Sequence, residues 1–406
     1  MLRKTRPYTF LNKTYFSKSA FRLFFCILLT GTGTQFFISC NKILAPEAIF
    51  SPSTSTHVQT GLAQQLLNLT GQVRVKLVWL QSRLIDDDTA HYVPFIENYL
   101  FNFPASQLLA FDTDEGNGRF LDSVPGSRST PLITRDGNKV LWTDYGKKSL
   151  FIINWDGTGK KVLIADDTNY LVVCVQWDTA TMTEWVYVAN AYNFGWQAMT
   201  SGTAVYRYPL NGTVLDTGRK ELVSDTLFLT PWTVSGDGKY AGGDINWPNP
   251  CIQTLPNGLV QVIGEFGGCH AQIAPDASYL FFYMRTDHSN LYLHQLTSFL
   301  RIVNLNLKMP GNNGQWDCVC PRWTNNSRYL TCGYPYTNGY FSWYKAMPPP
   351  SNPKTLAPGA SGEFCFGKFN DTFSDIDWVL VTDLDKRFRK AVGDGWLADG
   401  EGPGKP

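Results

Sequence analysis

The sequence predicts an all-β fold, a six-bladed β-propeller with seven blades as the alternative, and two observations carry this prediction. The first is the segment 130–164, TPLITRDGNKVLWTDYGKKSLFIINWDGTGKKVLI, which reads as four short strands with three tight turns. Asp-Gly pairs between β-branched and aromatic runs indicate hairpins, and four such antiparallel strands make one propeller blade. The second is that similar units recur along the chain, as they do in propellers.

The composition fits a sheet-rich exported protein. Of the 406 residues, 43% are hydrophobic, 14% aromatic and 17% charged, which suits a β-rich chain better than a helical cytosolic one. The formal net charge is +1. The segment 1–40 contains no acidic side chain, and its basic ones are Arg3, Lys4, Arg6, Lys13, Lys18 and Arg22. No basic stripe remains in the rest of the chain, so nucleic acid is not expected as a partner.

The segment 1–39 has the pattern of a signal peptide. A basic stretch precedes the apolar stretch 23–39, LFFCILLTGTGTQFFIS, which is followed by Cys40. A cysteine directly after FIS resembles a bacterial lipobox, although Phe37 departs from the usual leucine. The resemblance implies that Cys40 is acylated, becomes the first residue of the mature chain and anchors it in the membrane. A plain secretory signal and an uncleaved anchor remain alternatives.

The residue after this cysteine bears on the location. Asn41, in place of an aspartate, resembles lipoprotein cargo that two-membraned bacteria send to the outer membrane. We therefore expect the chain in the bacterial cell envelope, lipid-anchored at the outer membrane, on its periplasmic or its surface side.

Three segments follow the signal peptide. Residues 40–72 are expected to form a polar tether, in which 61–70, GLAQQLLNLT, is a candidate for one short helix. Residues 73–384 are expected to form the propeller. Residues 385–406 are a charged tail ending in ADGEGPGKP, which is expected to be disordered or to lead to a further domain.

The propeller segment divides into six units. The first contains VRVKLVWL and QLLAFD with a long insertion at 81–106, and the second is 130–164. The third, at 172–223, contains WVYVANA and TAVYRYPLNG. The fourth, fifth and sixth begin at about Thr230, Cys269 and Cys318, with TPWTVSGDGKYAGG, CHAQIAPDASYLFFYM and CVCPRWTNNSRYLTCG. Each of these three units places turn-forming residues between two apolar runs, as a hairpin requires.

The turns also resemble a known family. IAPDASYL and SGDGKY resemble the S-P-D-G-x-x-L element of TolB-like, WD-repeat-like β-propellers, although SGD and APDA depart from it. Together with FDTDEGNGRFL, PLITRDGNKVLWTD and GKFNDTFSDIDWVLVT, the chain resembles a group of bacterial propeller lipoproteins of unassigned role. The resemblance covers roughly residues 73–384. It implies the propeller fold and a location in the cell envelope, and it assigns no catalytic residue to this chain.

One face of the predicted ring is a candidate binding face. In an up-and-down blade the second turns share one face, and here the long insertions recur at second turns, at 81–106, 192–202, 246–249 and 334–362. Aromatic side chains there offer apolar area for sugars or peptides. The candidate ligand-binding residues are Tyr192, Phe194, Trp196, Trp247, Tyr336, Tyr340 and Trp343. The alternative is that these rings only pack the loops against one another.

The last unit is rich in cysteine, with Cys318, Cys320, Cys332 and Cys365. Cys318 and Cys320 share one strand face, and Cys332 is expected on the paired strand. A disulfide suits an oxidising envelope. A metal site is an alternative, although the C-x-C spacing is not that of the usual zinc motif. Buried thiols are the third possibility.

No motif in the chain indicates a reaction. H-E-x-x-H, G-x-S-x-G and G-x-x-x-x-G-K-[ST] are all absent, and only five histidines exist. We therefore assign no catalytic residue and no cofactor, and whether the chain is an enzyme stays open, with this absence against it. The hypothesis is an envelope-anchored binding module whose long second-turn loops hold a protein partner or a polysaccharide. The alternatives are a propeller hydrolase or lyase that acts on an envelope or extracellular polysaccharide, and a structural accessory subunit.

Overall fold

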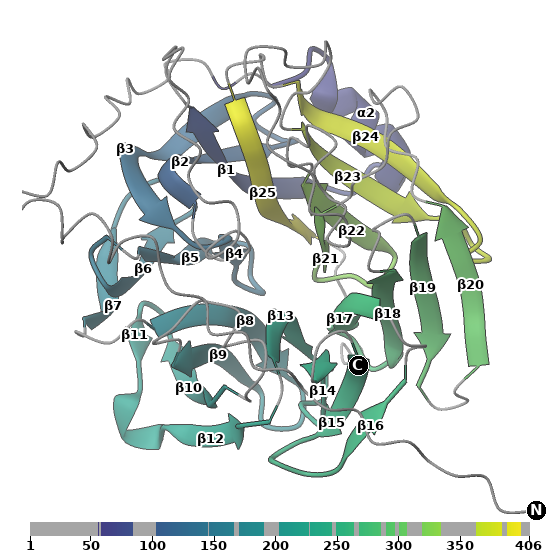
Figure 1. The fold of residues 1–406 in the computed structure, drawn as a ribbon. Coiled ribbons are helices and arrows are strands. Elements are labelled where there is room, and N and C mark those ends of the chain that lie inside the picture. Colours follow the sequence, from purple (N-terminus) through teal and green to yellow (C-terminus); the bar gives the residue numbers. More distant parts are fainter. Residues whose placement is uncertain are drawn as a thin grey trace, which may run out of the picture. The chain divides into compact units, whose positions relative to one another are not determined.

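The computed structural model describes most of the chain from Thr56 onward (Figure 1). The described residues are 56, 58–83, 103–144, 146–165, 170–190, 203–226, 228–245, 249–263, 268–285, 290–296, 300–306, 319–333, 363–383 and 388–398. All of them belong to one compact unit, Ala48–Pro406. The predicted signal peptide, 1–39, and Cys40 lie outside the described residues.

The strands form six antiparallel blades around a common axis, which confirms the six-bladed prediction (Figure 1). Blade 1 runs outward through β25 (Phe388–Leu397), β1 (Val75–Arg83), β2 (Phe103–Asp112) and β3 (Gly118–Arg128). Blade 2 contains β4 (Leu132–Ile133), β5 (Lys139–Asp144), β6 (Ser149–Asn154) and β7 (Lys161–Ala165). Blade 3 contains β8 (Tyr170–Asp178), β9 (Thr183–Asn190) and β10 (Val205–Asn211), with the short β11 (Val214–Leu215) and β12 (Glu221–Ser224) both paired to β10.

The other three blades have four strands each. Blade 4 contains β13 (Phe228–Val234), β14 (Tyr240–Ile245), β15 (Asn249–Thr254) and β16 (Val260–Val262). Blade 5 contains β17 (Gly268–Ile273), β18 (Leu280–Arg285), β19 (Asn290–Gln295) and β20 (Leu300–Asn306). Blade 6 contains β21 (Val319–Trp323), β22 (Tyr329–Gly333), β23 (Glu363–Phe369) and β24 (Ile376–Asp383).

The apolar core is divided among the interfaces between neighbouring blades. The buried residues form six clusters, and each cluster joins two adjacent blades, the pair of blades 6 and 1 included. In β1, for example, Trp79 packs towards blade 6 while Val78 packs towards blade 2. Successive side chains of a strand point to opposite faces, so a strand between two blades needs apolar residues on both. This explains why runs such as WVYVA are continuously apolar.

The tail predicted for 385–406 is wrong over Phe388–Leu397. These residues form β25, the innermost strand of blade 1, which pairs antiparallel with β1 from Val75 opposite Leu397 to Arg83 opposite Phe388. The physical reason is that β1 would otherwise present an unpaired row of backbone N–H and C=O groups at the axis. A strand from the other end of the chain fills this edge and closes the ring.

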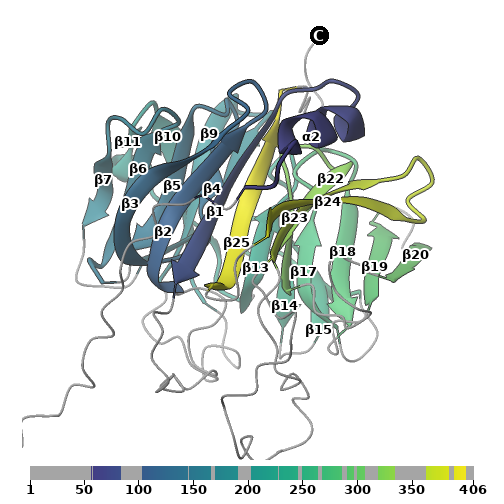
Figure 2. The ribbon, with the colours of Figure 1, turned by 90° about the horizontal axis from the view of Figure 1, so that it is seen from above.

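The tether predicted for 40–72 is wrong from Val58 onward, although the short helix within it is present as α2 (Leu62–Thr70). Val58 bridges to Thr382 of β24, and the Gln59 N–H donates to the Val381 carbonyl at 3.2 Å. Leu66 of the helix is fully buried in the cluster between blades 6 and 1. The segment therefore docks on the propeller and does not hang free of it (Figure 2).

We expect Leu66→Ala to loosen this docked helix. Leu66 is 0% exposed, and removing a buried leucine side chain costs about 2–5 kcal/mol. Limited proteolysis should then cut near 58–70 faster than in the parent protein. Gln64→Ala, on the exposed side of the same helix, is the matched control. Equal cleavage rates in the two variants would contradict the docking.

The strand order separates the connections into two faces of the ring (Figure 2). Consecutive strands are antiparallel, so the connections from the first to the second strand of blades 2 to 6 share one face, here called the first-turn face. The connections from the second to the third strand share the opposite face, here called the second-turn face. The long segments 84–102, 191–204 and 334–362 and the shorter 246–248 join strand ends at the second-turn face.

Candidate functional site

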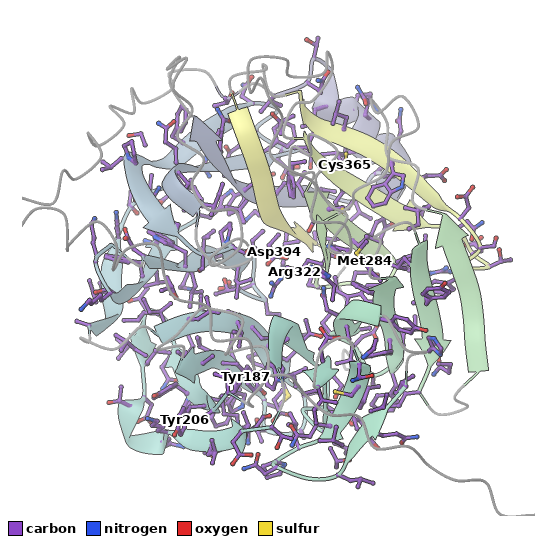
Figure 3. The ribbon with its side chains drawn as sticks, in the orientation of Figure 1. Tyr187, Tyr206, Met284, Arg322, Cys365 and Asp394 are labelled. Atoms are coloured by element: carbon purple, nitrogen blue, oxygen red, sulfur yellow. The ribbon has the colours of Figure 1, made fainter. Side chains whose placement is uncertain are left out.

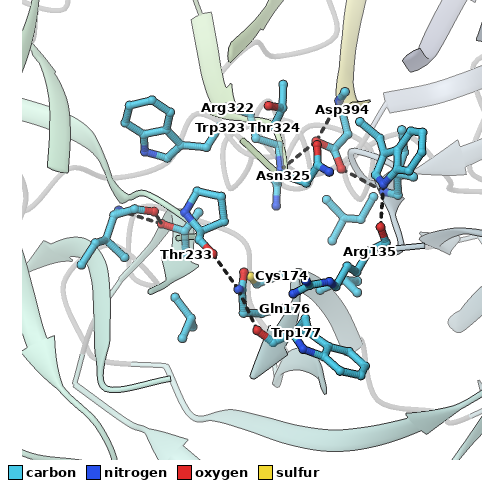
Figure 4. A pocket seen from close by; sticks show the side chains of 18 residues that line it. Arg135, Cys174, Gln176, Trp177, Thr233, Arg322, Trp323, Thr324, Asn325 and Asp394 are labelled. Atoms are coloured by element: carbon cyan, nitrogen blue, oxygen red, sulfur yellow. Dashed lines mark hydrogen bonds and ion pairs between the residues drawn. The ribbon is translucent and has the colours of Figure 1, made fainter. Parts of the chain in front are cut away.

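A small cavity lies on the axis, at the carboxyl ends of the six innermost strands (Figure 4). Its volume is about 70 Å³. That is far below the several hundred Å³ of a pocket for a drug-sized ligand, and it leaves room for a few water molecules or a small ion. Each blade contributes lining residues, among them Asp394, Arg135, Gln176, Thr233, Pro275 and Arg322.

The cavity is nearer to the first-turn face than to the second-turn face. Thr233 is next to last in its strand, and Pro275 follows the end of β17, so both lie just before a first turn. The long second-turn connections therefore leave the ring on the side away from the cavity.

Two side chains cross the axis and join blades that are not neighbours. Nη2 of Arg322, from blade 6, donates to the Val173 carbonyl of blade 3 at 3.0 Å. Nε2 of Gln176, from blade 3, donates to the Pro275 carbonyl after the inner strand of blade 5 at 2.9 Å. Polar side chains of blades 3 and 6 therefore occupy the centre of the ring next to the cavity.

Asp394 is the carboxylate of the cavity, and it lies beside Arg322 near the centre of the ring (Figure 3). Its Oδ2 accepts the Ile133 N–H and its Oδ1 accepts the Gly395 N–H, both at 2.9 Å. Oδ1 lies 3.9 Å from Nε of Arg322. Burial raises the pKa of Asp394 to about 6, although Arg322 and the two N–H groups oppose this rise.

Arg135 brings a second guanidinium to the cavity. Its backbone is held from two sides, since its N–H donates to Oε1 of Glu184 at 2.6 Å and its carbonyl accepts Nε1–H of Trp396 at 2.5 Å. Its guanidinium lies over the Trp177 ring, 5.1 Å from the centroid. Burial lowers the pKa of Arg135, partly offset by Glu184, and burial raises the pKa of Glu184 to about 7.

The described part of the chain offers neither a metal cluster nor a membrane-spanning helix. Among these residues, no group of three or more His, Cys, Asp or Glu side chains could hold a metal ion. No described helix is both long and apolar enough to cross a membrane.

The structure does not reach most of the residues that the sequence singled out. Cys40 and Cys318 lie outside the described residues. The seven candidate aromatic residues also lie outside them, namely Tyr192, Phe194, Trp196, Trp247, Tyr336, Tyr340 and Trp343. Cys320 falls within β21, but its side chain is not described. Cys332 is disulfide-bonded. Cys365 is buried directly opposite it on the neighbouring strand, but Cys365 is not its disulfide partner.

Sequence reasoning missed Arg135, Arg322 and Asp394. One signal was present, because the aligned first turns place Arg135 where the other units carry Gly236, Pro275 and Asn325. A long basic side chain at a position that is otherwise small or neutral stands out. Asp394 could not be found in this way, since it belongs to the segment taken for a tail.

Six blades around one axis, with the first closed by the last strand of the chain, define this protein as a six-bladed β-propeller. Among solved structures it is similar to TolB from Acinetobacter baumannii, with 14% identity and a TM-score of 0.46 over 82% of this chain and 70% of that chain. It is also similar to a putative TolB from Agrobacterium tumefaciens, with 10% identity and a TM-score of 0.44 over 79% and 98%. Neither a family model nor a curated protein matches the chain.

Proposed function

We propose that this propeller is a binding module of the cell envelope that holds a protein partner on its second-turn face. The observation that carries the proposal is the strand order, by which every second-to-third-strand connection leaves from one face. Four of these connections, 84–102, 191–204, 246–248 and 334–362, include the aromatic residues predicted to contact a ligand. Insertions that recur on one face of a repeat protein commonly serve binding.

A protein is the preferred partner because the four connections belong to blades 1, 3, 4 and 6. They therefore start from strand ends around the ring and not from one groove. A stable protein interface uses about 800 Å² on each partner, which such a distribution can supply. Trp and Tyr are the residues that most often dominate the energy of such interfaces.

The test is a pull-down from envelope extracts with the full chain as bait, followed by mass spectrometry. We expect a specific partner whose recovery falls in Trp196→Ala and Trp343→Ala. Asn138→Ala, an exposed change at the first turn of blade 2, is the control that should keep the partner.

A glycan array run in parallel tests the polysaccharide alternative. Release of soluble fragments from a bound glycan would favour the hydrolase or lyase alternative. No partner and no glycan would contradict the proposal.

We propose further that Cys40 carries a lipid that holds the module at the outer membrane. The support is the order of basic stretch, apolar stretch and cysteine within the segment 1–40. Cys40→Ala should move the protein from the membrane to the soluble fraction after cell lysis. Retention of this variant on membranes would count against the anchor and would leave the binding proposal intact.

A further inference from the structure

Among the described residues that line the axial cavity, Arg135 and Arg322 are cationic and Asp394 is the single carboxyl group. We propose that the cavity binds a small oxyanion, a phosphate or a carboxylate group, between the guanidinium groups of Arg135 and Arg322. This site is on the first-turn side of the ring, so it is separate from the partner face proposed above and does not depend on it. A guanidinium presents several N–H donors in a planar fork that matches both groups.

Arg135 is the first contact. Among the described residues, its guanidinium forms no ion pair and donates no hydrogen bond. It is nevertheless held in place, because it stacks on Trp177 at 5.1 Å and because both its backbone N–H and its carbonyl are hydrogen-bonded. A fixed cation with unused donors loses little conformational entropy when it binds an anion.

Arg322 is the second contact, and most of its donors also remain available. A guanidinium has five N–H groups, and one of them reaches the Val173 carbonyl. The 3.9 Å approach to Asp394 is beyond hydrogen-bond distance. The Asp394 oxygens instead accept the N–H groups of Ile133 and Gly395. The carboxylate is therefore only a weak competitor for Arg322.

The size of the cavity limits the ligand. About 70 Å³ suits inorganic phosphate or a short carboxylate, or the same group at the end of a larger molecule. The amide groups of Gln176 and Asn325 also line the cavity, but they already bond to backbone groups of Trp177, Pro275 and Leu397, so the two guanidinium groups carry the binding.

Binding should strengthen as the pH falls from 7.5 to 5.5. Asp394 has a pKa of about 6, so its negative charge, which repels an anion, is lost over this range. Cys174 of β8, with a pKa of about 11, stays neutral over this range. Glu184, which accepts the Arg135 N–H, has a pKa of about 7, so it also loses negative charge as the pH falls and acts in the same direction. The cavity then keeps two cations and no anion.

The experiment titrates the full chain with sodium phosphate and, separately, with sodium acetate, at pH 5.5 and 7.5. Ionic strength is kept constant with chloride, and binding is followed by tryptophan fluorescence, since Trp177, Trp323 and Trp396 line the cavity. We expect saturable binding of at least one anion, tighter at pH 5.5. Preference between the two probes identifies the phosphate or the carboxylate class.

Variants decide whether Arg135 and Arg322 form the site. Arg135→Gln should raise the Kd about tenfold or more, because hydrogen bonds to a charged group are lost. Arg135→Lys, which keeps the charge, should have an intermediate effect, and Asp394→Asn should weaken the pH dependence. Arg119→Gln is the matched control, because Arg119 stacks on Trp155 at 5.4 Å outside the cavity. The inference is overturned by no saturable binding of either anion at pH 5.5, or by an unchanged Kd in a folded Arg135→Gln protein.

Discussion

A chain that ends at Asp383 is expected not to fold, because it lacks β25. This strand supplies the inner edge partner of β1, the buried Leu397 and the link from Asp394 to the Ile133 N–H of blade 2. Whole domains are stable by only about 5–15 kcal/mol, and one buried leucine alone contributes about 1.5–3 kcal/mol. Circular dichroism and thermal melting should show no cooperative transition for this truncated chain.

The control for this truncation is a chain that ends at Ala398. The Ala398 N–H donates to the Arg74 carbonyl at 3.1 Å. Among the described residues, this is the backbone hydrogen bond nearest to the C-terminal end of the chain. Removal of 399–406 should therefore leave the melting temperature unchanged. A cooperative melt of the chain that ends at Asp383, near the temperature of the full chain, would show that β25 does not close the ring.

Two glycines of β25 allow a sharper version of the same test. A Cβ at Gly393 would lie 2.0 Å from the Val78 carbonyl oxygen, which belongs to the paired backbone and cannot give way without breaking the ladder. A Cβ at Gly395 would meet side-chain methyl groups at 3.0 Å and beyond, which can shift. Gly393→Ala should therefore lower the melting temperature much more than Gly395→Ala does.

Arg128→Met is expected to destabilise the junction of blades 1 and 2 by about 3–5 kcal/mol, the usual cost of removing one partner from a buried ion pair. The Arg128 side chain is 1% exposed, and its Nη2 donates to Oδ2 of Asp122 at 2.7 Å and to the Val124 carbonyl at 2.6 Å. Its Nη1 donates to the Ser106 carbonyl. The variant would leave the buried Asp122 carboxylate and the buried Ser106 carbonyl short of donors.

Urea unfolding of Arg128→Met and of Lys160→Met measures this effect. Lys160 contacts the same Asp122 carboxylate at 2.6 Å, but its side chain is 32% exposed. Water can replace an exposed partner, so Lys160→Met should cost clearly less, about 1 kcal/mol or below. Equal losses in the two variants would contradict the view that burial makes Arg128 important.

The ion pair of Arg128 with Asp122 also implies that the stability of the protein depends on pH. Burial alone would raise the pKa of Asp122, but Arg128, Lys160 and the Val124 N–H outweigh it and hold the pKa below its usual value. A lowered carboxyl pKa contributes stability above the pKa of the unfolded chain, and this stability is lost as the pH falls through the folded pKa. Arg128→Met should therefore shift acid unfolding to higher pH.

Much of the fold could be predicted from local signals. The turns of RDGN and WDGT bring neighbouring strands together, and alternating or continuous apolar runs specify which strands are buried on one face or both. These signals act over a few residues, so the segment 130–164 was recognisable as a blade. The helix at 61–70 was recognisable from its composition, but its docking on blade 6 was not, because that depends on Leu66 meeting a surface made elsewhere.

The sequence by itself predicted the hairpins, favoured six blades over seven, and indicated the face on which long connections recur. Only the tertiary structure decided how the ring closes and which charges meet at its axis. FRKAVGDGWL carries charges and two glycines, so its strand depends on the free edge of β1 and not on its own pattern. Asp394 binds the N–H of Ile133 from 261 positions away, and such a pairing is fixed by closure of the ring, which no local signal encodes.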